Sequence, residues 1–279
     1  MFAPVNGPPA APPRVGLLTA ATEGDASVPW DTGVVSWPES TGGWRIAQDC
    51  TTAVDKHGID DPEQLPVGTR GIVLQTVVRA RRTTVEEMSG RARRRLAAIT
   101  SKALARELWT GTATQLAPYD LPGSGEYANP QVGDQYVNPY LTDPRGEMYT
   151  AALPPLAAVG EVEARLADVL AGGPGHIHVP VAILGELALA LDRRGDVLYT
   201  AAGNIVIPDG GYPNRDQAGT GRHIYGTDQV TWWTGPITVL DDPSQVVRYD
   251  DNSIAVWAER PAAVLFNPQT LVGCPVEVP

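Results

Sequence analysis

Residues 83–109 read TTVEEMSGRARRRLAAITSKALARELW, and this stretch predicts the longest helix of the chain. Thr83 with Glu86, or Thr84 with Glu87, has the spacing of a capping box at its start. At about 1.5 Å per residue the helix is roughly 40 Å long, which exceeds the width of a small domain. We therefore expect a rod that lies along the rest of the molecule. Its apolar residues recur at three- and four-residue steps on one stripe: Val85, Met88, Ala92, Leu96, Ile99, Ala103 and Leu104.

Arginines crowd the first half of this helix and the residues before it. Between Arg81 and Arg95 there are six arginines and two glutamates, a local charge of +4 in a chain of formal net charge −11. Such a run is usually a solvated helix face. The separation of charge also favours pairing with acidic surfaces of a neighbour, or weak contact with nucleic acid. Arg91, Arg94 and Arg95 are the candidate contact residues.

The composition describes a folded chain of one large domain or two ordinary ones. It has 279 residues, of which 43% are hydrophobic and 19% charged, values that exclude a disordered protein. The net charge of −11 argues against an open nucleic-acid-binding surface as the main function. Cys50 and Cys274 are too few for a disulfide framework, so we expect free thiols. No signal peptide or apolar run of spanning length is evident, which predicts a cytoplasmic site of synthesis and no membrane partner.

Strand and helix patterns surround the long helix. A β-branched run at 71–81 predicts a strand that leads straight into it. Helices are expected over 156–171 and over 180–194, where glycines follow each pattern. The order of elements predicts an α+β fold with a turn-rich loop at 208–220 and an irregular linker at 112–150. Further extended segments are expected at 176–179, 197–200, 204–207, 229–240, 244–249, 253–265 and 276–278.

The N-terminal region is rich in proline and then in tryptophan. Residues 1–16 contain too many prolines for a helix or a central strand. They form either a disordered tail or an extended arm that becomes ordered on a neighbouring subunit. Residues 33–37 and 44–48 predict a hairpin surrounded by three tryptophans, which either pack locally or dock on another protein. These candidate contact residues are Trp30, Trp37 and Trp44.

No stretch carries the local signature of an active site. His176 and His178 lie on one face of a predicted strand, but neither His57 nor His223 is spaced to complete a metal site. We therefore expect a structural role for the pair, with no metal and no cofactor, since the glycine clusters also lack a nucleotide-binding pattern. A catalytic triad of residues remote in the chain stays open. The combination of extended arms, an aromatic hairpin and one rod is typical of a subunit of an assembly.

Several stretches resemble the major capsid proteins of tailed bacteriophages, which have the Hong Kong 97-like fold, and most closely those of phages of actinobacteria. Together they cover most of the chain from about residue 28 onward. Their shared order carries the resemblance more than any single piece. They are AGGPGHIHV (171–179), YTAAGNIVIPDGGYPN (199–214), WWTGPITV (232–239), NSIAVWAERPAAVLF (252–266), ARELWTG (105–111) and the hairpin GVVSWPES…WRIAQDC (33–50).

The resemblance implies a division of the chain into five parts. The region 112–150 matches nothing in the family. Some members carry a lysine–asparagine crosslink between subunits, and Lys56 would lie in the extended loop, but no partner is evident and no crosslink is predicted. The implied parts are an N-terminal arm (1–28), an extended loop with a leading strand (29–82), a peripheral domain with a long spine helix (83–155), an axial domain (156–235) and the return strands of the peripheral domain (236–279).

The resemblance also implies a function without catalysis. The chain would self-assemble into hexamers and pentamers of an icosahedral shell that encloses double-stranded DNA, with its extended loop across a neighbour's spine helix. Implied partners are further copies of the chain, scaffold, portal and decoration proteins, and packaged DNA by non-specific contact only. Assembly in the host cytoplasm would place it in the virion. Three alternatives stay open: an encapsulin-like bacterial compartment, a pentamer-only or minor capsid protein, and an enzyme with an unrecognised site.

Overall fold

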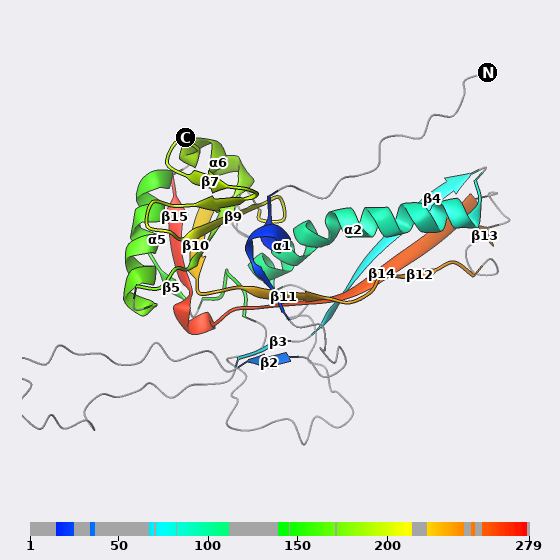
Figure 1. Cartoon of the computed structure of the whole chain (residues 1–279), viewed down its shortest axis with the longest axis horizontal. Helices are drawn as coiled ribbons and strands as arrows, with labels where there is room; N and C mark the ends of the chain where they lie inside the picture. Colours follow the sequence, from blue (N-terminus) through cyan, green and yellow to red (C-terminus); the bar gives the residue numbers. More distant parts are fainter. Residues whose placement is uncertain are drawn as a thin grey trace, which may run out of the picture.

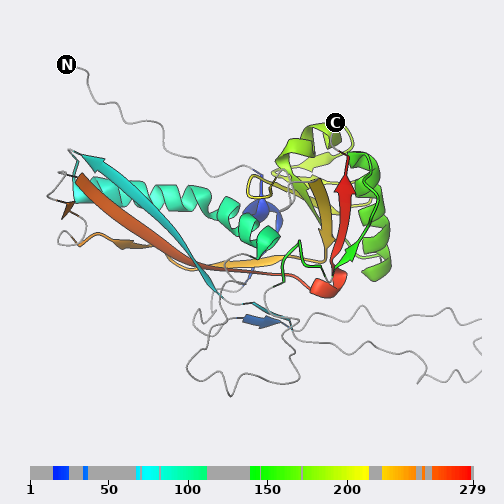
Figure 2. The same cartoon turned by 180° about the vertical axis from the view of Figure 1, so that it is seen from behind.

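The computed structural model describes two large sheets connected by a long helix, α2 (Val85–Thr110) (Figure 1). The six-stranded sheet and α2 form an elongated body, called here the extended lobe. The seven-stranded sheet, with α5 (Pro155–Val169) and α6 (Val181–Leu187), forms a compact lobe at one end of it, and the view from behind shows the same division (Figure 2). The described residues are 15–24, 34–36, 67–69, 71–81, 83–111, 139–144, 146–170, 172–213, 222–242, 247–248 and 253–277.

The predicted rod is confirmed as α2, which has 26 residues. Of the two capping options, the structure uses Thr84, whose side chain accepts a hydrogen bond from the backbone N–H of Glu87 at 3.2 Å. Gly111 ends the helix with a φ of 59°, a left-handed conformation that favours glycine. The centre of the predicted apolar stripe is fully buried: Met88, Ala92, Leu96 and Leu104.

In the extended lobe, α2 lies on one face of the six-stranded sheet. β14 (Ser253–Leu265) is the central strand, and β4 (Ile72–Arg81) pairs antiparallel with one edge of it. Alternate residues of β4, including Leu74, pack in one core with the buried stripe of α2. The strands on the other edge of β14 are β13 (Val247–Arg248), β12 (Thr238–Leu240) and β11 (Thr231–Thr234), and β1 (Thr22–Glu23) lies parallel to β11.

The compact lobe is built around the seven-stranded sheet. α5 and α6 pack on one face, where the buried residues of α5 meet Ile177 and Val179. The other face meets the C-terminal end of α2, where the ring of Trp109 lies 4.9 Å from Tyr225 and 5.1 Å from Tyr212 between centroids. The strands, in order across the sheet, are β5 (Glu147–Met148), β15 (Val272–Val276), β10 (Arg222–Thr227), β6 (His176–Pro180), β9 (Ile205–Asp209), β8 (Val197–Tyr199) and β7 (Asp192–Arg194).

Two short links carry the chain from one sheet to the other. The first leads from β10 to β11, and the second leads from β14 through a short 3₁₀ helix, η3 (Pro268–Thr270), to β15. The segment 236–279, which the sequence treats as one return to the peripheral domain, therefore supplies strands to both sheets. The bounds of the five implied parts stay a prediction.

The predicted helix over 180–194 is wrong beyond its first half. α6 ends at Leu187, and residues 192–194 form β7, which pairs with β8 in a hairpin. Gly195, which the sequence indicates as a helix end, has a φ of 64° in the turn of this hairpin. The charged residues of Asp192–Asp196 suit both a helix end and a hairpin turn. The pattern alone therefore did not distinguish the two.

The remaining predictions have mixed outcomes. The helix over 156–171 and the strand at 253–265 are confirmed as α5 and β14, whereas β10 was not predicted. Of the predicted hairpin, residues 34–36 form β2, which pairs with β3 (Val67–Thr69); residues 44–48 lie outside the described residues. None of the described helices combines the length and hydrophobicity needed to cross a bilayer. Cys274 is a buried free thiol, and Cys50 lies outside the described residues.

Candidate assembly surfaces

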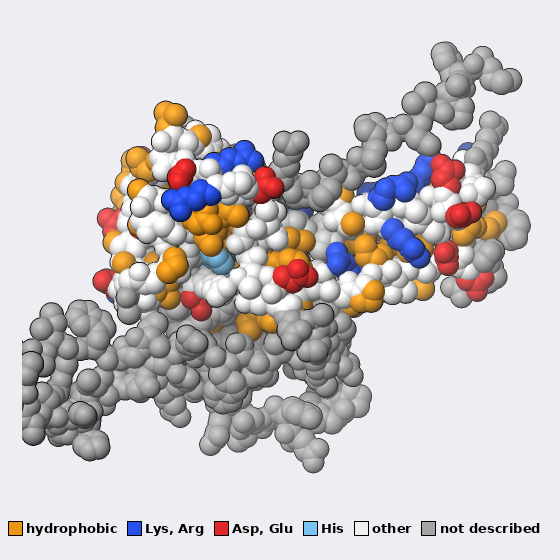
Figure 3. Space-filling model, viewed as in Figure 1, with side chains coloured by type: hydrophobic (Ala, Val, Ile, Leu, Met, Phe, Trp, Pro, Cys, Tyr) orange, Lys and Arg blue, Asp and Glu red, His pale blue; other side chains and the backbone are white. Residues whose placement is uncertain are grey.

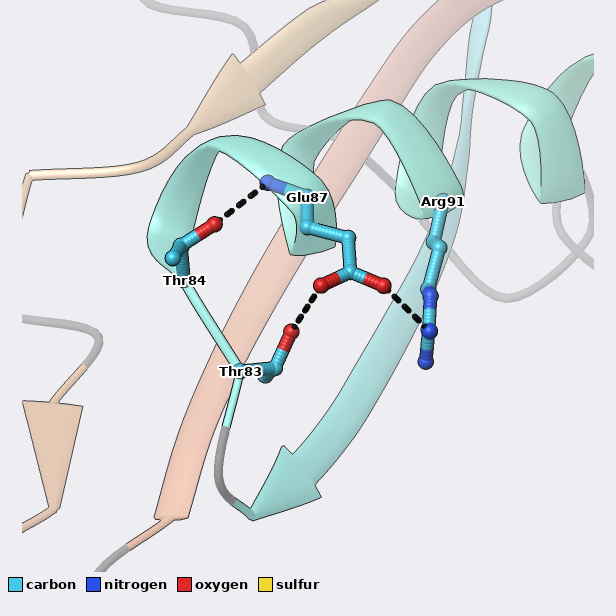
Figure 4. A network of polar contacts seen from close by, with 4 residues as sticks. All are labelled: Thr83, Thr84, Glu87 and Arg91. Carbon is cyan, nitrogen blue, oxygen red and sulfur yellow. Dashed lines mark hydrogen bonds and ion pairs between the residues drawn. The ribbon is translucent and has the colours of Figure 1, made fainter. Parts of the chain in front are cut away.

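The first turn of α2 is stabilised by a local network of polar contacts (Figure 4). The hydroxyl of Thr83 donates to Glu87 Oε2 at 2.7 Å, and Arg91 Nη2 lies 2.5 Å from Glu87 Oε1. The bond from Thr83 and the charge of Arg91 lower the pKa of the Glu87 carboxyl. The position of Glu87 in the first turn also suits the helix dipole. Arg91 is therefore engaged within its own helix, and its proposed contact with a neighbour stays a prediction.

The three consecutive arginines that follow do not share one face. Successive helical residues are about 100° apart, so Arg93 points away from the direction of Arg94 and Arg95. Arg91, Arg94 and Arg95 are spaced i, i+3, i+4 and do share a face. All three of Arg93, Arg94 and Arg95 are exposed, and they form no ion pair with any of the described residues. Figure 3 shows basic side chains spread over the extended lobe, with acidic ones towards its far end.

The face of the six-stranded sheet opposite α2 carries exposed apolar side chains. Val73 and Val77 on β4 are 59% and 47% exposed, and Leu240 on β12 is 45% exposed. Val77 and Leu240 both pair with Trp257 of β14, so these three residues form a row across the sheet. We call Val73, Val77, Leu240 and Trp257 the outer sheet face. Val73 is separated from this row by Gln75, whose side-chain amide donates to Glu259 Oε1 at 2.8 Å, and Trp257 is partly buried. Large exposed apolar side chains are typical of an interaction site.

The sequence of β4 indicates the outer sheet face, although this surface was not predicted from it. β4 spans IVLQTVVRAR, which is apolar at successive positions instead of alternating strictly. A strand that is apolar on both sides is typical of one covered on both faces. In the described structure α2 covers only one of them.

The tip of the compact lobe offers a third surface. Leu189, in the turn after α6, is fully exposed, and Val181 at the start of α6 is 49% exposed. In the neighbouring hairpin the guanidinium of Arg194 lies 4.9 Å from the ring centroid of Tyr199. The tip therefore combines an exposed leucine with a basic, aromatic hairpin.

The three tryptophans predicted as contact residues, Trp30, Trp37 and Trp44, lie outside the described residues. Their role stays a prediction. Of the described tryptophans, Trp109 is fully buried between the lobes and Trp232 nearly so, whereas Trp233 and Trp257 are partly buried. Trp232 Nε1 donates to the carbonyl of Ala21 at 3.3 Å, which connects β11 to the N-terminal segment.

The histidine pair has the structural role that the sequence predicts. Both rings lie on the α2 side of β6. The Nδ1 of His176 accepts from the backbone N–H of Val230 at 2.9 Å. The Nδ1 of His178 lies 2.8 Å from the Tyr212 hydroxyl, and its Nε2 lies 3.0 Å from the Thr227 hydroxyl. Burial lowers the pKa of His176 to about 4 and that of His178 well below its usual range. Both rings are thus neutral and satisfied by protein groups.

No arrangement for catalysis or metal binding emerges from the described part of the chain. It contains no group of three or more histidine, cysteine or acidic side chains placed to hold a metal ion. Among the described residues, the partly buried carboxyl of Asp228 has a pKa raised to about 7, and burial is the main cause. Its Oδ1 accepts from the backbone N–H of Asn267 at 2.9 Å, and its own N–H donates to the Thr270 hydroxyl at 2.9 Å. These hydrogen bonds connect the two links between the sheets, so Asp228 has a structural role.

Solved structures share the fold of this chain along nearly its whole length. No family model matches it, and no curated protein matches it significantly. Among solved structures, the capsid of an empty GTA particle has a TM-score of 0.56 at 12% identity, over 100% of this chain and 94% of that one. The structure of Mycobacterium phage Bobi has a TM-score of 0.51 at 13% sequence identity, and the match covers 100% of this chain and 96% of that one. The fold is Hong Kong 97-like.

An encapsulin complex also shares this Hong Kong 97-like fold. The holo-SrpI encapsulin complex from Synechococcus elongatus PCC 7942 gives a TM-score of 0.52 at 12% identity, over 99% of this chain and 92% of that one. The fold class predicted from the sequence is confirmed, including the long helix and the α+β composition. At such identities the likeness concerns the fold.

Proposed function

We propose that the chain is a non-catalytic structural subunit of an icosahedral phage capsid that encloses double-stranded DNA. The observation that carries this proposal is the length of the match: the fold likeness to the GTA capsid spans 100% of this chain and 94% of the other. In this proposal the protein resides in the virion after assembly in the host cytoplasm.

The extended lobe supplies contacts on two opposite faces. On one, Arg94 and Arg95 are exposed and available to acidic groups of a neighbour or, non-specifically, to packaged DNA. On the other, the outer sheet face exposes apolar surface whose burial would stabilise association. The extended loop, which precedes the leading strand within residues 29–82, would lie across a neighbour's extended lobe, with Trp30, Trp37 and Trp44 as anchors.

The compact lobe would supply the contacts that form hexamers and pentamers. Its tip exposes Leu189 and Val181, and a ring of copies around an axis would bring these side chains together. No single contact needs to be strong, because each subunit would make many at once and their effects multiply. Scaffold, portal and decoration proteins are the further partners proposed for such a shell.

A second candidate is an encapsulin-like bacterial compartment, because the SrpI encapsulin shares the fold at a TM-score similar to the phage structures. The two candidates differ in contents. A phage shell is proposed to hold DNA, and a compartment holds cargo protein. Neighbouring portal or terminase genes favour the phage, whereas a neighbouring peroxidase or ferritin-like gene favours the compartment.

Sedimentation velocity of the purified chain, over a range of concentrations, tests the proposal. We expect a fast-sedimenting population far larger than a monomer of 29.6 kDa. Nuclease treatment of particles from native expression then separates the candidates, since protected DNA supports the phage capsid. A monomer with saturable turnover of a small substrate would support the enzyme alternative instead.

A further inference from the structure

Residues 15–24, called here the strap, contact both lobes, and Leu17 belongs to the core that α2 shares with its neighbours. Its helix, α1 (Leu17–Ala20), lies between α2 and the seven-stranded sheet (Figure 1). Its strand, β1, then extends the six-stranded sheet beside β11. The side chain of Leu17 is fully buried and packs with the core of α2. The strap therefore fills the space between α2 and the compact lobe.

Asp209, at the end of β9, holds the strap in place. Its Oδ2 accepts from the backbone N–H of Leu17 at 2.9 Å and from the hydroxyl of Ser101 on α2 at 2.8 Å. Its Oδ1 accepts from the backbone N–H of Gly211 at 2.8 Å. One buried carboxylate thus joins the strap, the long helix and the compact lobe. Bonds to a charged acceptor in a buried site are among the stronger hydrogen bonds.

The strap fits this position too closely for a larger residue at either end. A Cβ at Gly16 would lie 2.7 Å from Asp209 Oδ2 and 3.0 Å from Ser101 Oγ. A Cβ at Gly24 would lie 2.0 Å from Trp233 Nε1. Both distances to the nearest atom are shorter than a carbon tolerates, so both glycines are required by the close approach.

The strap also attaches at the first link between the sheets. The backbone N–H of Thr22 donates to the carbonyl of Val230 at 3.0 Å. The backbone N–H of Gly24 donates to the carbonyl of Trp232 at 2.8 Å. Val230 lies two residues after Asp228, which accepts a hydrogen bond from the backbone N–H of Asn267 in the second link. The strap is therefore fixed to α2, to β9 and to the junction about which the two lobes would turn.

We propose that the strap is a wedge that sets the angle between the extended and compact lobes, with Asp209 as its latch. When it is docked, α2, β9 and β11 are held as one body. When it is undocked, the lobes keep only their covalent links and direct packing, and the angle between them varies. Hinge motions of this type are absorbed by short links between rigid elements.

The isosteric variant Asp209→Asn tests the latch in the unassembled full-length chain. Whichever way the new amide is oriented, its NH₂ group faces the N–H of either Leu17 or Gly211, so one donor stays unpaired. Asp196→Asn is the matched control, because Asp196 is exposed in a hairpin turn of the same lobe. By hydrogen exchange, we expect the strap amides to exchange roughly tenfold faster in Asp209→Asn and unchanged in the control.

Distances between spin labels test the wedge. Labels on non-natural keto side chains at Glu86 and Ala164, both exposed, report the separation of the far end of α2 from α5. In Asp209→Asn we expect a broader or displaced distance distribution than in wild type and the control. Faster strap exchange with an unchanged distribution would overturn the wedge, and unchanged exchange would overturn the latch. Should Asp209→Asn fail to fold, Gly24→Ala displaces the other end of the strap and takes its place under the same criteria.

A consequence for shells rests on the proposed function. If the lobe angle sets the curvature between subunits, particles of Asp209→Asn have a wider range of diameters than those of Asp196→Asn. Because exchange and label distances are measured on the unassembled chain, they test the strap even if the chain forms no shell. Shells that form normally while the strap is shown to undock freely, with no change of lobe angle, refute the inference and leave the proposed function standing.

Discussion

Replacing Asp228 by asparagine removes a titratable group from the junction between the two sheets while keeping its shape. In wild type the pKa of Asp228 is raised to about 7 from an ordinary 3.8, chiefly because burial disfavours the charged form. A group whose pKa is raised on folding stabilises the folded state fully below its unfolded pKa, and this contribution is lost as the pH rises through the folded pKa. The cost of the charged carboxyl therefore grows between about pH 4 and pH 7 and is complete above about pH 7.

The size of the effect follows from the two pKa values. A difference of about 3 units corresponds to about 4 kcal/mol at most. Asp228 keeps partial contact with solvent, and screening reduces the value. We therefore expect the stability of Asp228→Asn, relative to wild type, to rise by about 1–2 kcal/mol between pH 5 and pH 8. The asparagine oxygen still accepts from Asn267, so the contact between the links is kept.

Urea unfolding of the unassembled chain, followed by tryptophan fluorescence at several pH values, measures this difference. His176 and His178 also titrate in this range, but only in the unfolded chain. Their lowered pKa values mean that their contribution is present above about pH 6.5 and is lost on acidification. Wild type and Asp228→Asn both contain the two histidines, so the histidine contribution cancels in the difference between their unfolding free energies. A difference between variant and wild type that stays constant from pH 5 to pH 8 would refute the reasoning.

Three further predictions concern assembly and the long helix. Trp37→Ala and Trp44→Ala leave circular dichroism unchanged but impair particle formation in light scattering; normal particles from both would count against their role as anchors. Arg94→Glu weakens assembly in a salt-dependent way, whereas Arg93→Glu, on a different side of α2, has a smaller effect in the same turbidity assay. Thr84→Ala removes the cap of α2 and lowers the free energy of unfolding by about 1 kcal/mol in urea titrations, without changing the fold.

Sequence patterns predicted the long elements well, because burial on one side leaves a clear period. The stripe from Met88 to Leu104 and the strand at 253–265 are set by the core between α2 and its sheet. β10 escaped prediction since its run RHIYGT is short and contains Gly226, where a Cβ would lie 2.5 Å from Val162 of α5. That glycine is required by packing between elements remote in the chain, which no local pattern records.

The assembly surfaces were predicted less completely than the fold. Charge clustering made Arg91, Arg94 and Arg95 candidate contact residues, which stay a prediction, but the ion pair of Arg91 with Glu87 depends on the exact start of the helix. The outer sheet face needed the register of β4, β14 and β12, which aligns Val77, Trp257 and Leu240 from three distant segments. The role of Asp209 could not be predicted either, because its hydrogen-bond partners on the strap and on α2 lie far away in sequence.

Cryo-electron microscopy of the purified full-length chain, with a candidate scaffold protein where one is encoded nearby, tests the central claim most directly. A structural subunit with this Hong Kong 97-like fold is expected to form closed shells, or rings the size of pentamers and hexamers. Averaged images should place α2 along the shell wall and the tip with Leu189 near the axes. A chain that stays monomeric at high concentration, with and without the scaffold, would contradict the claim.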